Sequence, residues 1–203
     1  MRILEQNRAP NPRRVRIFLA EKGITVPYEQ VDIMKLDHRL PGFAALNPMR
    51  QVPVLVLDDG TAIAESVAIC RYFEEEQPEP PLFGTGARDR AVVEMWNRRM
   101  ELGLLYRVAQ CFRHTHPAMA PLETPQVKDW GEANRPRAVE MLEWMDEELS
   151  GRRFIAGDSY SIADITALVA VDFMKVARIE RPARLKNVER WYSDVSGRPS
   201  AKA

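Results

Sequence analysis

The 203-residue chain has little cysteine, no net charge and no long apolar run. Cys70 and Cys111 are its only cysteines, which excludes both the spacing of a zinc site and the disulfide framework of a small secreted domain. The 29 basic residues balance the 29 acidic ones, so no overall field would attract nucleic acid or an anionic membrane. The longest apolar run, Ile165 to Val171, is too short to cross a bilayer, and polar residues interrupt the amino terminus before a signal-peptide core develops. We therefore expect a cytoplasmic protein that contacts neither nucleic acid nor membrane and holds no metal.

What the chain does contain is the composition of an ordinary globular protein, with 45% apolar and 29% charged residues. Strand-like and helical runs alternate up to residue 80, whereas only helical spacing follows residue 88. We expect strands over 2–6, 26–31, 52–57 and 62–64, and helices over 12–21, 66–75, 88–113, 126–149, 161–176 and about 188–195. Prolines and glycines between Gln77 and Gly86 predict a boundary, so we assign an α/β domain to 1–80, a linker to 81–88 and an all-helical domain to 89–203.

The connections between the strands predict how they pair. A helix separates the first two strands, and a crossover of that length is what parallel pairing requires. Asp58-Asp59-Gly60 joins the last two strands, and Asp-Gly supplies the positive φ of a tight hairpin turn. The sequence therefore predicts a mixed sheet with one parallel and one antiparallel connection.

The first helix is expected to start at Asn11-Pro12, because Asn is a preferred N-cap and Pro a preferred first helical residue. Lys22-Gly23 would end it. The loop before Asn11 then leads to exposed backbone amides, which can stabilise a thiolate or another anion. The alternative is that Asn11 only caps the helix.

Two further elements carry chemistry. Pro53 enters a strand without an amide to donate, so a cis bond before it would leave the Val52 backbone open to an extended, peptide-like ligand. Glu65-Ser66 stands where a strand ends and a helix begins; Ser66 is a plausible N-cap beside free amides that suit a carboxylate, and Glu65 suits an ammonium group. Together they fit an amino-acid head group, whereas an edge-strand proline and a simple cap are the structural alternatives.

The Ser161-Ile162-Ala163-Asp164 stretch predicts a folding element rather than a catalytic one. Ser161 would cap a helix and Asp164 would return the hydrogen bond, in a capping box with Asp in place of the usual Glu. The negative charge of Asp164 also favours the positive end of the helix.

These motifs, in this order and spacing, resemble the soluble glutathione transferases over nearly the whole chain. The amino-terminal half carries the resemblance in three segments: Pro10 to Gly23, Asn47 to Leu55 and Ala64-Glu65-Ser66. In the second half, Phe154 to Ile165 is similar to that family's helix-start signature, and Trp191 with Arg198-Pro199-Ser200 resembles its usual ending.

The resemblance implies a thioredoxin-like domain joined to a helical bundle, usually a homodimer, with glutathione as co-substrate. By position, Val52 would bind the cysteinyl part through its backbone, with Pro53 as the cis residue. Glu65 and Ser66 would hold the γ-glutamyl end. The glycine carboxylate would fall to His38 and Gln51, with Lys35 as a weaker candidate. The electrophile would meet the helical domain at Met100, Leu104, Arg107, Phe112 and the loop 115–125.

One departure from the family concerns the group that activates the glutathione sulfur. Most members place a tyrosine, serine or cysteine at or just after the first strand, but no tyrosine, serine, threonine or cysteine precedes Thr25 here. The remaining candidates are the side chain of Asn11, the backbone of the turn from Arg8 to Pro12, and His114 or His116 from the helical domain. Either histidine has an alternative role as a cap at the carboxyl end of its helix.

We therefore expect a homodimeric, detoxifying glutathione transferase that conjugates glutathione to a small hydrophobic electrophile. Another glutathione-dependent reaction, such as isomerisation, dehalogenation or peroxide reduction, is one alternative. The other is a non-catalytic binding or regulatory protein that keeps the fold and has lost the sulfur activator.

Overall fold

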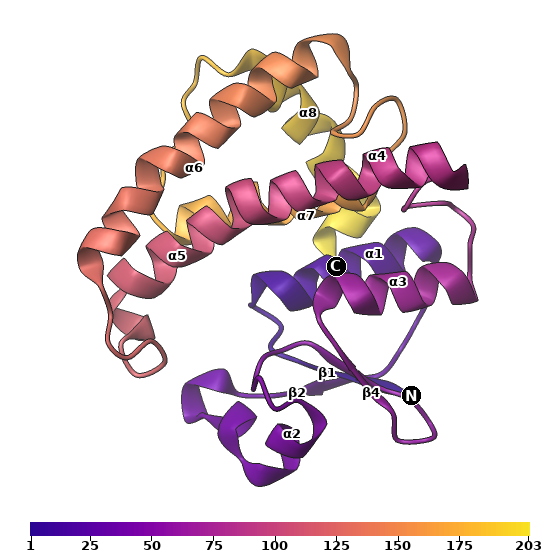
Figure 1. The fold of residues 1–203 in the computed structure, drawn as a ribbon, viewed down its shortest axis with the longest axis vertical. Helices are drawn as coiled ribbons and strands as arrows, with labels where there is room; N and C mark the ends of the chain where they lie inside the picture. Colours follow the sequence, from indigo (N-terminus) through magenta and orange to yellow (C-terminus); the bar gives the residue numbers. More distant parts are fainter. The chain divides into compact units, whose positions relative to one another are not determined.

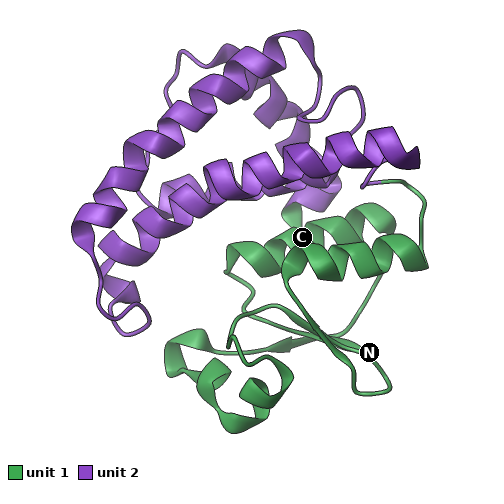
Figure 2. Cartoon of the chain, viewed as in Figure 1, with its two compact units in different colours: residues 1–81, 202–203 green, residues 82–201 purple.

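The computed structural model describes residues 1–203 and divides them into two compact units. Unit 1 contains residues 1–81 together with the last two residues, and unit 2 contains residues 82–201 (Figure 2). Unit 1 combines strands with helices, and unit 2 is helical (Figure 1).

Unit 1 is built on a four-stranded sheet in the order β2-β1-β3-β4. The strands are β1 (Arg2–Glu5), β2 (Tyr28–Gln30), β3 (Val54–Val56) and β4 (Ala62–Ala64). β1 pairs in parallel with β2 and antiparallel with β3, and β3 pairs antiparallel with β4. Both predicted connections are thus confirmed, including the Asp-Gly turn, where Gly60 has a φ of +87°. The strands are shorter than the expected runs, since pairing stops at Val54 and not at Val52.

Helices cover both faces of this sheet (Figure 1). α1 (Pro10–Lys22) and α3 (Ser66–Glu76) pack against each other on one face. α2 (Pro41–Leu46), which the sequence did not predict, covers the other face with Phe43. Side chains alternate along a strand, so Leu4, Val54 and Val56 share the α2 side.

The start of α1 corrects a sequence-based prediction. The helix begins at Pro10, its N-cap is Ala9, and Asn11 is an exposed residue of its first turn with no capping bond. Pro10 and Pro12 both have a fixed φ that suits the start of a helix, and the helix begins at the earlier one. The predicted end is confirmed, since Gly23 terminates α1 with a φ of +66°.

Lys22 fastens the end of unit 1 to α1. Its Nζ is buried and donates to the carbonyl oxygens of Gln77 (2.7 Å), Pro78 (3.1 Å) and Pro80 (2.7 Å). It also pairs with the Glu74 carboxylate at 2.5 Å. The segment before the boundary is therefore held by a specific polar contact and not only by its prolines.

Unit 2 consists of a long helical segment and three further helices. α4 (Gly86–Arg99) continues through a π-helical turn (Met100–Leu105) into α5 (Tyr106–Thr115). α6 (Lys128–Glu148) packs along α5, and Gly131 allows the close approach because a Cβ there would lie 2.6 Å from Thr115 Cγ2. α7 (Ile162–Val176) and α8 (Lys186–Ser196) complete the unit.

The buried helix α7 starts with the predicted capping box. Ser161 and Asp164 exchange hydrogen bonds, and the Asp164 carboxylate also accepts from Ile155 N–H and Trp191 Nε1, both at 2.9 Å. Asp164 is completely buried, and this burial raises its pKa to about 6, although the four donors oppose the shift. The network joins three segments of unit 2 at one carboxylate, and the predicted capping box is confirmed.

Candidate functional site

The sequence-predicted residues of unit 1 converge at one end of the sheet. Val54 pairs with Ala64 on one side and with Leu4 on the other. β1 and β4 therefore end, and β3 begins, at the same edge of the sheet. The loop after β1, the segment before β3 and the start of α3 therefore meet at the same edge.

At the start of α3, Ser66 is the first helical residue and not the N-cap, which corrects the predicted cap. The N-cap is Glu65, whose φ of +67° is rare for a residue with a side chain. The N–H groups of Ser66, Val67 and Ala68 make no hydrogen bond within the chain, so the helix presents free donors at its positive end.

Ser66 is held from below by a buried cation. Its Oγ accepts a hydrogen bond of 3.0 Å from Nη1 of Arg14, a residue of α1 that is buried. The guanidinium adds positive charge beneath the free amides of α3, whereas the exposed Glu65 supplies a carboxylate beside them. The arrangement suits a ligand carrying a carboxylate and an ammonium group on one carbon. Sequence reasoning missed Arg14 because its partner lies 52 positions away.

The middle of the edge is formed by Val52, which precedes a cis bond to Pro53. The N–H and C=O of Val52 make no hydrogen bond within the chain. The buried Asn47 side chain fixes the backbone before Val52 through two hydrogen bonds: its Nδ2 donates to Gln51 C=O at 2.8 Å, and its Oδ1 accepts from Met49 N–H at 3.1 Å. The result is an open stretch of backbone that an extended ligand can pair with.

His38 lies within the electrostatic influence of two arginines, Arg39 and Arg50. The charges of Arg39 and Arg50 act on His38 and, together with burial as the main cause, lower its pKa. His38 Nδ1 is buried and makes no hydrogen bond in the chain. Gln51 is exposed beside Arg50, whereas the Lys35 ammonium faces Asp32 at 3.7 Å. An anion would therefore be favoured at His38, Arg39 and Arg50, and the two arginines were not among the predicted residues.

The start of α1 has a single free backbone donor. Pro10 and Pro12 have no N–H, Ala9 N–H donates to Gln6 C=O, and Arg13 N–H donates to Ala9 C=O. Only the N–H of Asn11 makes no hydrogen bond in this first turn. Asn11 thus offers two unused donor groups, one from the backbone and one from its exposed side chain.

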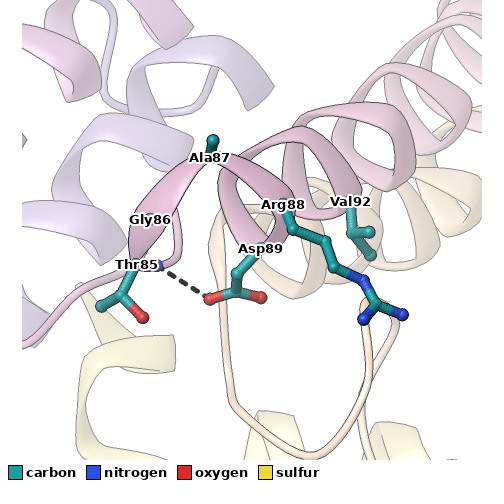
Figure 3. Close-up of a pocket in the computed structure, with 6 residues that line it drawn as sticks. All are labelled: Thr85, Gly86, Ala87, Arg88, Asp89 and Val92. Atoms are coloured by element: carbon teal, nitrogen blue, oxygen red, sulfur yellow. Dashed lines mark hydrogen bonds between the residues drawn. The ribbon is translucent and has the colours of Figure 1, made fainter.

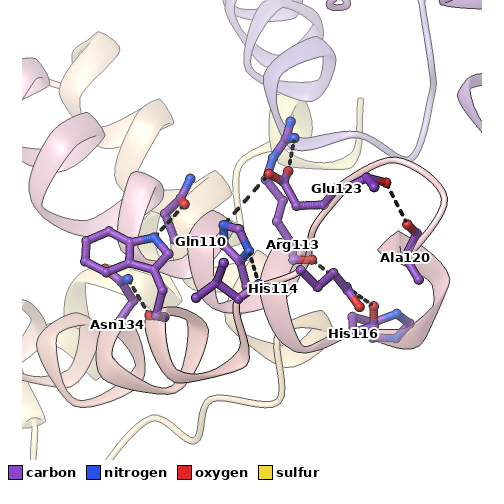
Figure 4. Close-up of polar contacts among 11 residues, drawn as sticks. Gln110, Arg113, His114, His116, Ala120, Glu123 and Asn134 are labelled. Carbon is purple, nitrogen blue, oxygen red and sulfur yellow. Dashed lines mark hydrogen bonds and ion pairs between the residues drawn. The ribbon is translucent and has the colours of Figure 1, made fainter.

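His114 and His116 belong to a polar cluster at the end of α5 (Figure 4). His114 Nδ1 accepts from Val127 N–H at 3.0 Å, and its Nε2 lies 3.9 Å from Glu123. His116 Nδ1 accepts from Ala118 N–H at 3.2 Å. Both rings therefore stabilise the loop between α5 and α6, and only their Nε2 atoms remain for other chemistry.

The residues expected to meet the electrophile are mostly occupied within unit 2. Met100 and Leu104 are completely buried in its core, which contradicts a role in lining a pocket. Arg107 donates to Asn134 at 3.1 Å, and Phe112 packs against Phe173. The structure therefore assigns these side chains to packing first.

Two hollows occur elsewhere in unit 2. One, of about 340 Å³, lies at the start of α4 and is lined by residues from Thr85 to Val92, where Asp89 already accepts from Thr85 N–H at 2.8 Å (Figure 3). The other, of about 420 Å³, lies between α7 and α8 beside Tyr192. Neither hollow is lined by the predicted site residues.

The structure contains no group of three or more His, Cys, Asp or Glu side chains that could hold a metal ion. None of its helices is both long and apolar enough to span a membrane.

Comparison with known proteins gives consistent matches. The models of the glutathione S-transferase N-terminal and C-terminal domains match residues 9–76 and 128–194. The chain is 38% identical to glutathione S-transferase 2 of Saccharomyces cerevisiae, covering 100% of this chain and 88% of that protein. The crystal structure of Gtt2 from the same yeast superposes with a TM-score of 0.95 at 38% identity, covering 100% and 99% of the two chains. A glutathione S-transferase domain-containing protein of Marinobacter aquaeolei VT8 gives 0.96 at 41% identity, covering 98% and 99%.

Proposed function

Because the chain belongs to the glutathione S-transferase family, we propose that unit 1 binds glutathione along the end of its sheet and that the enzyme conjugates its sulfur to a small hydrophobic electrophile. The observation that carries the proposal is that the free amides of α3 and the unpaired backbone of Val52 lie at the same edge of the sheet. Glutathione has matching groups in the same order: an amino acid head, a peptide-like middle and a second carboxylate.

The γ-glutamyl end fits the start of α3. Its carboxylate would accept from the amides at Ser66 and from the Ser66 hydroxyl, with the Arg14 charge beneath. Its ammonium group would pair with the exposed Glu65 carboxylate. Charge-assisted hydrogen bonds of this kind are about twice as strong as neutral ones, so this end would contribute most of the orientation.

The rest of the tripeptide continues along the same edge. The cysteinyl N–H and C=O would pair with the Val52 backbone beside Pro53. The glycine carboxylate would lie at His38 and Gln51, where Arg39 and Arg50 add positive charge. Lys35 stays the weaker candidate for this end because its ammonium faces Asp32.

In this proposal Asn11 activates the glutathione sulfur. Lowering a thiol pKa by about two units, from about 8.5, requires less than about 3 kcal/mol. One or two oriented donors at a helix start can supply that, and Asn11 has two that are unused. His114 and His116 stay predicted contributors, through Nε2.

The proposed reaction forms one carbon–sulfur bond and releases one proton from the thiol. The thiol proton leaves to solvent, the thiolate electron pair forms the carbon–sulfur bond, and the electrophile either takes up a proton after addition or releases its leaving group. We also propose that the protein acts as a cytoplasmic homodimer in detoxification; sedimentation at micromolar concentration tests the dimer, which a constant monomer mass would contradict.

A paired binding and turnover experiment tests the proposal. Calorimetry should detect glutathione binding to the wild type, and Ser66→Ala should weaken it by about 1–3 kcal/mol, because a charged ligand group loses a donor. Ser193→Ala, at an exposed serine of α8, is the matched control and should bind as the wild type does. Conjugation of a model aryl halide should accompany binding. Binding without turnover would instead favour the non-catalytic alternative, and equal affinity in a folded Ser66→Ala would remove Ser66 from the site.

Asn11 requires its own pair of variants. Asn11→Ala removes the side-chain amide, and Asn11→Pro removes the backbone N–H as well, at a helix position that tolerates proline. The pKa of bound glutathione, measured from thiolate absorbance, should rise in Asn11→Ala and rise further in Asn11→Pro. An unchanged thiol pKa in both variants, with the fold intact, would leave the histidines as the remaining candidates.

A further inference from the structure

A closed ring of hydrogen bonds holds the loop between β1 and α1. The Glu5 carboxylate accepts from Arg16 Nη1 at 2.5 Å through one oxygen and from Gln30 Nε2 at 2.9 Å through the other. Arg16 Nη2 donates to Asn7 C=O at 2.6 Å, and Gln30 Oε1 accepts from Asn7 N–H at 3.1 Å. Both backbone groups of Asn7 are thereby fixed by side chains that share one carboxylate.

The ring is built from groups that are costly to bury without such partners. Glu5 is the last residue of β1 and its side chain is 3% exposed, while that of Arg16 is 15% exposed. A buried carboxylate is tolerated where its oxygens are paired and hydrogen-bonded, as both are here. The ion pair of Arg2 with Glu29 at 2.9 Å, by contrast, lies on the surface and joins no loop backbone.

The position of the ring in the chain gives it a consequence for chemistry. Asn7 belongs to the loop that leads into the first turn of α1, where the N–H groups have no acceptor within the helix. Arg16 holds the Asn7 carbonyl, and Asn11 N–H makes no hydrogen bond in the chain. The ring thus fixes the loop that leads to the one free donor of the turn.

We infer that Glu5, Arg16 and Gln30 are positioning residues for the reaction: they hold the Asn7 peptide so that Asn11 keeps its free donor directed at the thiol of bound glutathione. The inference rests on the proposed function, because it takes the start of α1 as the place where the sulfur lies. Arg16 has the central role, since its two nitrogens contact Glu5 and Asn7 at once.

Arg16→Lys is the most informative variant. Lysine keeps the positive charge beside Glu5, but its single nitrogen cannot reproduce the two-pronged contact with Glu5 and Asn7 C=O. Glu5→Gln removes the shared carboxylate as a second test. Glu29→Gln is the matched control, because it makes the same charge change one residue from Gln30 in an exposed pair outside the ring.

We expect Arg16→Lys and Glu5→Gln to raise the pKa of the bound thiol and to lower kcat about tenfold, as misplacement of a reacting group does. The affinity for S-methylglutathione, which has no thiol, should change less than about twofold if only the sulfur contact is disturbed. Glu29→Gln should match the wild type in each measurement. A folded Arg16→Lys with unchanged thiol pKa and kcat would overturn the inference. A loss of kcat accompanied by an equal loss of affinity for S-methylglutathione would overturn it as well.

A measurement without ligand separates this inference from the proposed function. Hydrogen exchange at Asn7 and Ala9, whose N–H groups donate to Gln30 Oε1 and Gln6 C=O, should quicken in Arg16→Lys while the amides of β3 keep their wild-type protection. Unchanged exchange in the loop would show that the ring does not hold it. Loop exchange that quickens as expected, in a protein that fails to bind glutathione, would overturn the proposed function and the link to the sulfur while confirming that the ring fixes the loop.

Discussion

Asp164 gives a prediction whose sign and size both follow from its contacts. Its two oxygens receive four hydrogen bonds, from Ile155 and Trp191 on one oxygen and from the backbone and hydroxyl of Ser161 on the other. Asp164→Asn keeps the shape but replaces one acceptor oxygen by an NH₂ group. At low pH the protonated carboxyl can donate its O–H to the Ser161 hydroxyl and still accept from Ser161 N–H, whereas the NH₂ group cannot accept. One buried donor is then left without a partner, so we expect a loss of about 1–3 kcal/mol at low pH.

The loss should become smaller as the pH rises. Burial raises the pKa of Asp164 from 3.8 to about 6, so between these values the folded protein holds a proton that the unfolded chain has released. The contribution of Asp164 to stability is therefore complete below about pH 4 and is lost as the pH rises to about 6, by about 3 kcal/mol in all. Because the Asn variant has no carboxyl at this position, the difference between wild type and variant should shrink by that amount.

Urea unfolding followed by tryptophan fluorescence measures this difference. All four tryptophans, at positions 96, 130, 144 and 191, belong to unit 2, so the signal reports the unit that contains Asp164. Free energies of unfolding should be compared at about pH 4.5 and pH 7 in both proteins, an interval over which about 2 of these 3 kcal/mol are lost. A difference that stays constant or grows with pH would refute the reasoning, since the carboxyl would then have an ordinary or lowered pKa. Trp191→Phe, which removes one donor only, is the milder variant if Asp164→Asn does not fold.

Three further predictions concern the two units. Lys22→Met should lower the stability of unit 1 by about 3–5 kcal/mol, seen as a lower melting temperature by circular dichroism, because the carbonyls of 77–80 lose their buried donor. Because the pKa of His38 is lowered in the folded protein, the free energy of unfolding should rise with pH up to about 6.5. A carboxylate bound beside His38 should raise this pKa again. Calorimetry with S-methylglutathione near pH 6 should therefore show proton uptake that His38→Gln abolishes; uptake that persists would exclude His38. His114→Ala and His114→Asn should both lower kcat at least about tenfold. Only the Asn variant keeps an acceptor for Val127 N–H, so it preserves the structural contact. A wild-type kcat in His114→Asn would show that His114 has a structural role only.

Local patterns were sufficient to predict most of the fold. The Asp-Gly turn, Gly23 at the end of α1 and the capping box at Ser161 are each decided within a few residues, and the structure confirms them. The boundaries of β3 differ because an apolar run extends further than the paired part of a strand. α2 was not predicted because its six residues, which include Pro41, are too few to show a helical period.

The polar contacts that shape the site could not be predicted in this way. Arg14 and Ser66 are 52 positions apart, and Lys22 and Gln77 are 55 apart, so nothing in the neighbouring sequence indicates either pair. A buried arginine or lysine also has the same sequence context as a solvated one on a helix. For the same reason Ser66 was predicted to be a cap, although its hydroxyl accepts from Arg14 instead.

In the proposed site, a backbone donor would take the place of the missing hydroxyl near the sulfur. Prolines at positions 10 and 12 remove two of the donors that a helix start normally offers, which concentrates the remaining positive end on Asn11 N–H. A hydroxyl can rotate to its acceptor, whereas a backbone donor has only the direction that its loop gives it. A sulfur site that depends on Asn11 would therefore need a rigid loop before it. The Glu5, Arg16 and Gln30 ring is the feature of unit 1 that supplies such rigidity.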